Sequence, residues 1–327
     1  MESIRMFMNV IPHPKKCPKH LKSVAAIGFF DGVHLGHQKI IEKAIRLAKR
    51  NHKKSVVVTF DRHPQEVLRP TRSKSLLTNL EHKLCLIRKL KPDYCYVIRF
   101  TKAFSRKTPR DFVRQILHRD LKATDVVVGF NFRFGHERQG DVKVLGELGR
   151  QFGYCTWVVS PVKSHKHLVS SSRIREAVKQ GDLSLAKSLL GHPVSMMGKV
   201  ISGDGKGKTF GFPTANLKVF NQVVPPPGVY LVRVKFNKKV YNGLLNIGPR
   251  AKFLEGKTLF IRKEKDEIKI EIHILNFRST VYGKTLFVEI IKKLRDTQKF
   301  NDADSLKRQV FLDIKKAGLF FKKQKKR

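Results

Sequence analysis

Short apolar segments alternate with helical patterns throughout residues 23–190. Five of them are continuous runs, as expected for strands covered on both faces: SVAAIGFF, SVVVTF, DYCYVIRF, DVVVGF and YCTWVV. Between them lie stretches such as HQKIIEKAIRLAKR, which places Ile41, Ile45 and Ala48 on one helical stripe. Strands that alternate with helices predict an α/β fold with a mostly parallel, doubly wound sheet.

The pattern changes near Gly191. The segments beyond it are short, several alternate with polar residues, and Gly, Pro and Asn turns separate them. They are MMGKVISG, GVYLVRVKF, KVYNGLLNIG, KTLFIR, IKIEIHIL and TLFVEII. Such strands predict an antiparallel barrel or sandwich. We therefore expect two domains, residues 1–190 and 191–327.

A helical pattern closes the second domain in NDADSLKRQVFLDIKKAG. Its apolar stripe consists of Leu306, Val310 and Ile314. Asn301 or Asp302 can cap the start of this helix, and Gly318 can end it.

The chain is strongly basic, with 68 Lys and Arg against 26 Asp and Glu. Such a charge attracts nucleotides, nucleic acid or anionic membranes. The basic residues are spread along the whole chain, however, which favours a general lysine bias over a dedicated binding surface. A nucleic-acid partner is therefore possible but not required.

The cysteines and the hydropathy pattern indicate a cytoplasmic protein. No CxxC spacing occurs among Cys17, Cys85, Cys95 and Cys155, so neither a disulfide framework nor a zinc site is suggested. No segment approaches the ~18 unbroken apolar residues of a membrane span. The start, MESIRMFMNVIPHPKK, lacks the apolar region of a signal peptide. We expect no membrane partner.

The stretch GFFDGVHLGHQ follows the first predicted strand. Glycines at 28 and 32 let the backbone approach a ligand closely, at the edge of the sheet where open α/β folds bind ligands. His34 and His37 are three residues apart, hence neighbours at the start of the next helix. Helix amides and two imidazoles suit a polyphosphate, although capping or surface roles for the histidines remain open.

A glycine-rich stretch, GDGKGKTFGFPTANL, lies in the second domain. Its glycines and lysines can wrap phosphate with backbone amides, and an ordinary surface loop is the alternative. Thr214 and Asn216 are two apart on an extended segment, so they face the same way. Their oxygens are of the kind that Mg²⁺ takes together with nucleotide phosphate.

FDGVHLGH resembles the signature of the HxGH nucleotidyltransferases, and its longer form is similar to that of the bacterial bifunctional riboflavin kinase/FAD synthetases. Three further stretches match that family in order: VVVTFDRHP, VVGFNFRFGHERQGD and SSSRIREAVKQGD, in which Ser172 replaces the usual Thr. In the second domain PTAN is similar to the riboflavin kinase signature. It is followed in family order by PPPGVY, NGLLNIG, IEIHIL, VYGK and KLRDTQKF.

This resemblance implies a Rossmann-like nucleotidyltransferase domain followed by an antiparallel β-barrel kinase domain with a C-terminal helix. It implies an enzyme that phosphorylates riboflavin with ATP to FMN and adenylylates FMN with ATP to FAD and pyrophosphate. Mg²⁺ is the implied cofactor, and we expect a monomer or weak oligomer. An FAD synthetase with a weakened kinase, and a nucleic-acid-binding protein on the same scaffold, are the alternatives.

The resemblance also implies site residues. The catalytic set is His34, His37, Arg175 and Glu271, with Glu271 as general base of the kinase. The expected ATP contacts are Gly28, Phe29, Asp31, Gly32, Ser171, Ser172, Arg173, Gly203, Gly205, Lys208, Gly211 and Pro213. The expected flavin contacts are His63, Pro64, Asn131, Phe132, Phe134 and Arg295. Thr214 and Asn216 are expected to hold the metal.

Structural roles remain open for several of these residues. Residues 170–175 can be a helix cap with a solvated basic face, in which Ser171 and Ser172 cap the helix. Phe132 and Phe134 can be core residues, and Glu271 can face solvent. The sequence also departs from the family, because NIGPRAKF carries Ala251-Lys252 in place of Pro-Thr. The charged stretch 254–269 is longer than usual, and Asp296 stands at the acidic position after Leu-Arg.

Overall fold

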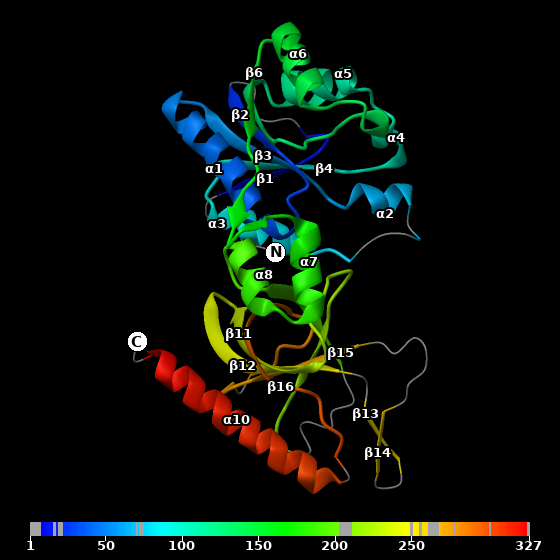
Figure 1. Cartoon of the computed structure of the whole chain (residues 1–327), viewed down its shortest axis with the longest axis vertical. Helices are drawn as coiled ribbons and strands as arrows, with labels where there is room; N and C mark the ends of the chain where they lie inside the picture. Colours follow the sequence, from blue (N-terminus) through cyan, green and yellow to red (C-terminus); the bar gives the residue numbers. More distant parts are fainter. Residues whose placement is uncertain are drawn as a thin grey trace. The chain divides into compact units, whose positions relative to one another are not determined.

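The computed structural model describes residues 8–15, 18, 22–69, 71, 75–202, 211–248, 251–254, 257–260, 268–277, 279–300 and 302–325. The chain forms two compact units (Figure 1). The first comprises Met1–Ile174 with Ser188–Gly191, and the second comprises Arg175–Lys187 with His192–Arg327. The segment 175–187 thus belongs to the second unit, although it precedes the change in sequence pattern at Gly191.

The first unit is built on a parallel six-stranded sheet with the order β1-β4-β3-β2-β5-β6. Its strands are β1 (Asn9–Pro12), β2 (Ser23–Ile27), β3 (Lys54–Phe60), β4 (Tyr94–Ile98), β5 (Ala123–Gly129) and β6 (Cys155–Val159). The five apolar runs are confirmed as strands. The sequence did not predict β1, because its NVIP segment is mostly exposed at the edge of the sheet and carries no apolar run.

Helices cover this sheet. They are α1 (Leu35–Arg50), α2 (Pro64–Leu68), α3 (Leu80–Lys89), α4 (Lys102–Ser105), α5 (Pro109–Phe112), which continues as a π-helix (Val113–Asp120), and α6 (Val142–Phe152). Two further helices, α7 (Ser171–Gln180) and α8 (Leu183–Leu190), follow, and residues 175–187 of them belong to the second unit. α1 packs against β2, β3 and β5 through its buried Ile41, Ala44 and Ala48. The π-helix and α6 bury Ile116, Leu117 and Leu145 in a core shared with alternate residues of the strands. The doubly wound α/β prediction is therefore confirmed.

The second unit contains a closed antiparallel barrel with the order β10-β15-β12-β11-β16-β9. Its strands are β9 (Ser195–Ile201), β10 (Ala215–Lys218), β11 (Gly228–Phe236), β12 (Lys239–Gly248), β15 (Lys269–Ile274) and β16 (Thr285–Arg295). The barrel is confirmed, with two differences in strand use. The KTLFIR segment supplies β14 (Lys257–Phe260), which pairs with β13 (Ala251–Leu254) outside the barrel, and the end of the glycine-rich stretch supplies β10.

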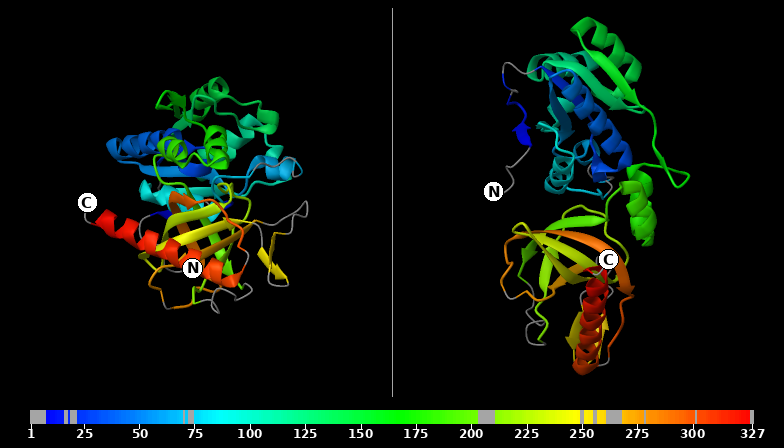
Figure 2. Two further views of the ribbon diagram at one scale, coloured as in Figure 1. Left: turned by 60° about the horizontal axis from the view of Figure 1, so that its bottom comes forward. Right: turned by 90° about the vertical axis from the view of Figure 1, so that its left-hand side faces the viewer.

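The chain closes with α10 (Ala303–Lys325), which lies along the barrel (Figure 2). The Oδ1 of Asp302 accepts the amide of Ser305 at 2.6 Å, so Asp302 caps the helix as predicted. Gly318 does not end it, because Ala317 and Phe321 pack on the barrel and carry the helix past the glycine. Among the helices that the structure describes, none has the length and apolar character needed to cross a membrane.

Candidate active sites

The β2–α1 turn (residues 28–34) leaves the carboxyl end of the parallel sheet. Phe30, Gly32 and Val33 have φ values of 56°, 76° and 41°, all in the left-handed region. A Cβ on Gly32 would lie 2.7 Å from Cδ1 of Leu77, and one on Gly28 would lie 2.7 Å from the Phe30 ring. Gly32 is therefore favoured by its left-handed conformation and by packing on Leu77, and Gly28 by packing on the Phe30 ring within the turn.

His34 and His37 are in direct contact, as their spacing predicts. Their rings stack with centroids 3.5 Å apart at an interplanar angle of 17°. His34 caps α1, and its Nδ1 accepts the amide of His37 at 3.3 Å. Phe30 packs its ring edge-to-face with that of His37, with centroids 5.3 Å apart.

The surroundings of His37 keep its ring neutral. Desolvation, with the neighbouring His34 and Lys83, holds the pKa of His37 well below its usual value. By exposed area the residue is only half-buried, but its Nδ1 is shielded from solvent and has no hydrogen-bond partner among the described residues. A neutral imidazole carries one N–H, so it can donate to a ligand without first gaining a proton.

The side chain of Asp31 has a structural role in the turn. Its buried carboxylate accepts the amides of Leu77 and Thr78 at 2.9 and 3.0 Å. The amide of Gly32 in turn donates to Oγ1 of Thr78 at 3.0 Å. The Asp31 side chain thus fixes the turn against residues 77–78. The expected ATP contact of Asp31 stays a prediction.

The start of α7 is tied to the same turn. The Ser171 hydroxyl donates to the Asp31 carbonyl at 3.1 Å, and the residue that caps the helix is Ser170, whose Oγ accepts the amide of Arg173 at 3.3 Å. The expectation that Ser171 and Ser172 cap the helix is thus wrong. Ser172 and Arg173 are exposed at this end of the helix. Arg175 falls in the part of α7 that belongs to the second unit, and its role stays a prediction.

His63 and Pro64 begin α2. The Nδ1 of His63 accepts the amide of Gln65 at 3.1 Å, and Pro64 is the first helical residue. The His63 ring meets the Phe29 ring edge-to-face, with centroids 4.6 Å apart. His63 is thereby brought to the β2–α1 turn.

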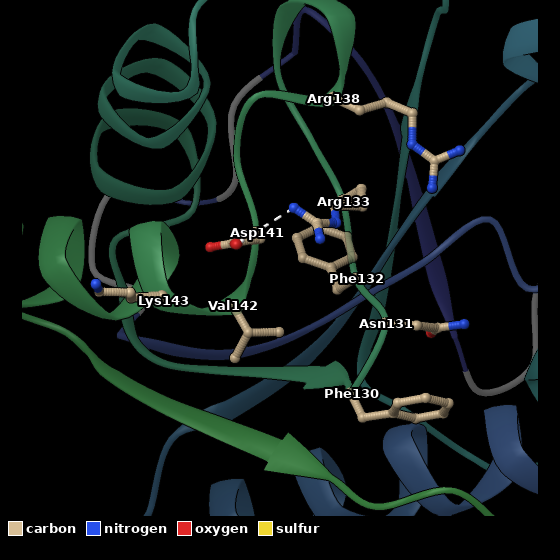
Figure 3. A pocket seen from close by; sticks show the side chains of 8 residues that line it. All are labelled: Phe130, Asn131, Phe132, Arg133, Arg138, Asp141, Val142 and Lys143. Atoms are coloured by element: carbon tan, nitrogen blue, oxygen red, sulfur yellow. Dashed lines mark hydrogen bonds and ion pairs between the residues drawn. The ribbon is translucent and has the colours of Figure 1, made fainter.

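A pocket of about 290 Å³ lies after β5 (Figure 3). It is lined by Phe130, Asn131, Phe132, Arg133, Arg138, Asp141, Val142 and Lys143. Asn131 and Phe132 therefore border a cavity, as a flavin contact requires. Phe134 does not line it: this ring stacks on Phe132 with centroids 5.4 Å apart and is buried in the core, 7% exposed.

The pocket has a basic lining that sequence reasoning missed. Arg133 pairs with Asp141 at 3.2 Å, whereas Arg138 and Lys143 form no ion pair within the described part of the chain. The basic residues of FRFGHERQGDVK were visible in the sequence. Their gathering around one pocket involves a turn in which Gly135, Glu137 and Arg138 all have positive φ.

A row of polar residues crosses three strands of the barrel. Glu271 on β15 is the register partner of Asn216 on β10 and of Asn246 on β12. Residues directly opposite one another in an antiparallel pair point to the same face, so the three side chains are neighbours. Glu271 alternates with the buried Ile270 and Ile272, as predicted. The pairing with Asn246 was not foreseen.

Asn216 is suited to a metal ion. The residue is 9% exposed, and its buried Oδ1 has no partner within the residues described. A buried amide oxygen without a hydrogen bond is costly unless a ligand satisfies it. Thr214 precedes it by two residues and is half-buried. These oxygens fit Mg²⁺, and no cluster of three His, Cys, Asp or Glu side chains in the described ranges offers another metal site.

Lys269 lies beside the proposed base, with its Nζ 2.9 Å from Oε1 of Glu271. On the same strand, Nδ1 of His273 lies 2.9 Å from the carbonyl of Pro213 and so fixes the start of the PTAN segment. Gly211 has φ +83°, which explains a glycine there. Gly203, Gly205 and Lys208 lie outside the described residues.

The guanidinium of Arg295 forms hydrogen bonds with residues of the second unit. Its Nε and Nη2 bond Oδ2 of Asp313 at 3.0 and 2.8 Å, and its Nη1 donates to the Asp296 carbonyl at 2.9 Å. Asp313 is 2% exposed. The guanidinium therefore joins β16 to α10, and its expected flavin contact stays a prediction.

Comparison with known proteins matches each unit to a family model. A model of FAD synthetase matches residues 16–173, and one of riboflavin kinase matches residues 190–321. The bifunctional riboflavin kinase/FMN adenylyltransferase of Bacillus subtilis is 38% identical over 318 residues, 96% of this chain and 98% of that protein. The Escherichia coli K12 protein of that name is 33% identical over 91% of this chain and 92% of its own length.

A solved structure has the same fold. The crystal structure described as a macrolide-efflux protein from Streptococcus pneumoniae has a TM-score of 0.76 and 28% identity, and the match covers 93% of this chain and 97% of that one.

Proposed function

The chain belongs to the bifunctional riboflavin kinase/FMN adenylyltransferases, and we propose how its residues divide the two reactions. The protein uses ATP to phosphorylate riboflavin to FMN, and it uses ATP again to adenylylate FMN to FAD. We assign FMN adenylylation to residues 1–190 and the kinase to residues 191–327. The observation that carries this assignment is that the stacked histidines and the Asn216–Glu271 pair belong to different units.

FAD formation needs no protein nucleophile, because the FMN phosphate attacks the α-phosphorus of ATP and pyrophosphate leaves. The protein must hold two anions in line and offset their repulsion. The close-packed β2–α1 turn and the α1 amides receive the phosphates. A neutral His37 donates an N–H to a phosphoryl oxygen without first having to be protonated. Ser172 and Arg173, both exposed at the start of α7, add a hydroxyl and a fixed charge.

The pocket after β5 binds the flavin of FMN. Phe132 offers an aromatic face and Asn131 an amide, which suit the ring system and its polar edge. Arg138 and Lys143 make the lining positive, which favours an anionic flavin such as FMN over riboflavin. His63, whose ring contacts Phe29 of the β2–α1 turn, and the adjoining Pro64 supply further flavin contacts.

In the kinase, Glu271 takes the proton from the riboflavin hydroxyl that attacks the γ-phosphate of ATP. Thr214 and Asn216 hold Mg²⁺, which when bound neutralises charge on the phosphates. Lys269 holds the Glu271 carboxylate in place through their 2.9 Å contact. We further propose a cytoplasmic enzyme that works as a monomer or weak oligomer.

The test is to incubate the pure chain with riboflavin, ATP and Mg²⁺, and to separate flavins by chromatography. Both FMN and FAD are expected. If FAD forms only when FMN is supplied in place of riboflavin, the kinase is weakened. No flavin product, together with tight and salt-sensitive RNA binding, would favour the nucleic-acid alternative.

A further inference from the structure

Lys83 is a buried cation with no role in the proposed mechanism. It lies on α3 and is only 2% exposed. An ammonium group removed from water costs several kcal/mol unless its surroundings replace the lost hydration. A lysine at this position therefore calls for specific partners.

Those partners lie at the carboxyl ends of two neighbouring strands. The Nζ of Lys83 donates to the carbonyls of Phe29 and Phe60, at 3.0 and 2.9 Å. The same Nζ lies 4.1 Å from the centroid of the Phe29 ring. Phe60 ends β3, whereas Phe29 lies past the end of β2. Lys83 thus fastens the first residues of the β2–α1 turn to the sheet, beyond the last strand–strand hydrogen bonds.

The conformation of the β2–α1 turn depends on contacts that hold its backbone in place. Phe30 and Val33 both hold left-handed backbone conformations, which persist only where surrounding contacts impose them. Phe29 contacts His63, and Phe30 contacts His37, through edge-to-face ring packing. A displacement of the Phe29 carbonyl would therefore move both histidines.

We propose that Lys83 is a positioning residue for FAD formation: by fixing the Phe29 and Phe60 carbonyls, it sets the turn on which His37 and His63 pack. The inference rests on the proposed function of the β2–α1 turn. Lys83 does not itself touch substrate. Its charge also contributes to keeping His37 neutral.

The test compares Lys83→Met with Lys53→Met in the full-length chain. Lys53 serves as control because it is a partly buried lysine, its side chain 23% exposed and paired with Asp125 at 3.0 Å, and it stands just before β3, at the amino end of that strand. Lys83→Met should lower kcat for FAD formation roughly 10- to 100-fold, with the KM for ATP nearly unchanged, because a small misplacement of catalytic groups mainly affects the transition state. FMN formation should stay at the wild-type rate in both variants.

Thermal unfolding separates positioning from stability. A buried cation replaced by an apolar side chain of similar length need not destabilise the fold. The proposal expects low kcat in a chain that melts no lower than Lys53→Met. It is overturned if folded Lys83→Met forms FAD within twofold of wild type, or if Lys53→Met loses kcat equally.

A second variant covers the case in which Lys83→Met does not fold. The hydroxyl of Thr59 also donates to the Phe29 carbonyl, at 3.0 Å, and Thr59→Val removes that bond with little change of shape. Its kcat for FAD formation should fall about threefold or more, and a wild-type kcat would count against the proposal. If instead His37→Ala left FAD formation intact, the assignment of the turn itself would fail.

Discussion

His34 and His37 stack face to face, and the ring of His34 also caps the helix that carries His37. The two imidazoles therefore pack against each other at the start of the helix. The pair is held on a turn whose backbone is strained and closely packed. This arrangement places a neutral nitrogen at the ligand-binding edge of a parallel sheet.

Gly32→Ala should disturb the turn more than the fold as a whole. The new Cβ would meet Leu77 at 2.7 Å in a left-handed conformation, which should lower the free energy of unfolding of the first unit by about 1–3 kcal/mol. Urea denaturation followed by the fluorescence of the single tryptophan, Trp157, measures this. The control is Gly146→Ala in α6, where nothing lies within 4 Å and stability should rise by about 0.5–1 kcal/mol. Equal effects would contradict the packing argument.

Lys83 should make stability rise with pH in the alkaline range. Burial lowers its pKa from 10.5 to about 8. Between these values the unfolded chain binds the proton more tightly, so unfolding becomes less favourable as pH rises from about 8 to about 10. The difference in unfolding free energy between wild type and Lys83→Met removes the contribution of other groups. A difference that is flat over this range, or that falls, would show that the ammonium is not desolvated.

Arg295 should act mainly as a tie between β16 and α10. Arg295→Met removes the cation beside the buried carboxylate of Asp313, to which, among the described residues, only the Gln309 amide then donates, and should destabilise the second unit by about 3 kcal/mol. The double variant Arg295→Met with Asp313→Leu removes both charges and should recover most of that loss. Thermal unfolding by circular dichroism measures both variants. If the double variant is no more stable than the single one, the ion pair is not the cause.

Asn216→Leu should raise the Mg²⁺ concentration required for FMN formation. The change removes a buried oxygen that has no protein partner in the described chain. The half-saturating Mg²⁺ concentration should rise about tenfold or more, while FAD formation keeps its wild-type Mg²⁺ dependence. Asn242→Leu, on β12 away from Glu271, is the control and should leave both unchanged. Unaltered Mg²⁺ dependence in Asn216→Leu would remove this residue from the metal site.

The sequence predicted those features that depend on local pattern. Five strands of the sheet carry continuous apolar runs, although β6 is mostly exposed, and His34 and His37 are neighbours by helical spacing alone. It could not predict pairings set by tertiary structure. Asn246 lies opposite Glu271 only through the register of β12 and β15. At the start of α7 Ser170 is the cap, whereas the Ser171 hydroxyl donates to the Asp31 carbonyl.

The burial of Lys83 is the clearest case of a feature that the sequence could not predict. In LEHKLCLIRK a lysine is expected on the exposed face of the helix. Two carbonyls at strand ends, distant in sequence, provide the site that allows its burial. The strand β10, at the end of the glycine-rich stretch, was not predicted either, because its four residues give too short a pattern to identify a strand.

The division of labour between the two units is tested most directly by His37→Ala and Glu271→Gln in otherwise identical full-length chains. FMN made from riboflavin and FAD made from supplied FMN are quantified by chromatography. His37→Ala should lower FAD formation about 100-fold and spare FMN formation. Glu271→Gln should lower FMN formation by at least about 100-fold and spare FAD formation. If either substitution abolished both activities in a folded chain, the assignment of the two reactions to separate sites would be wrong.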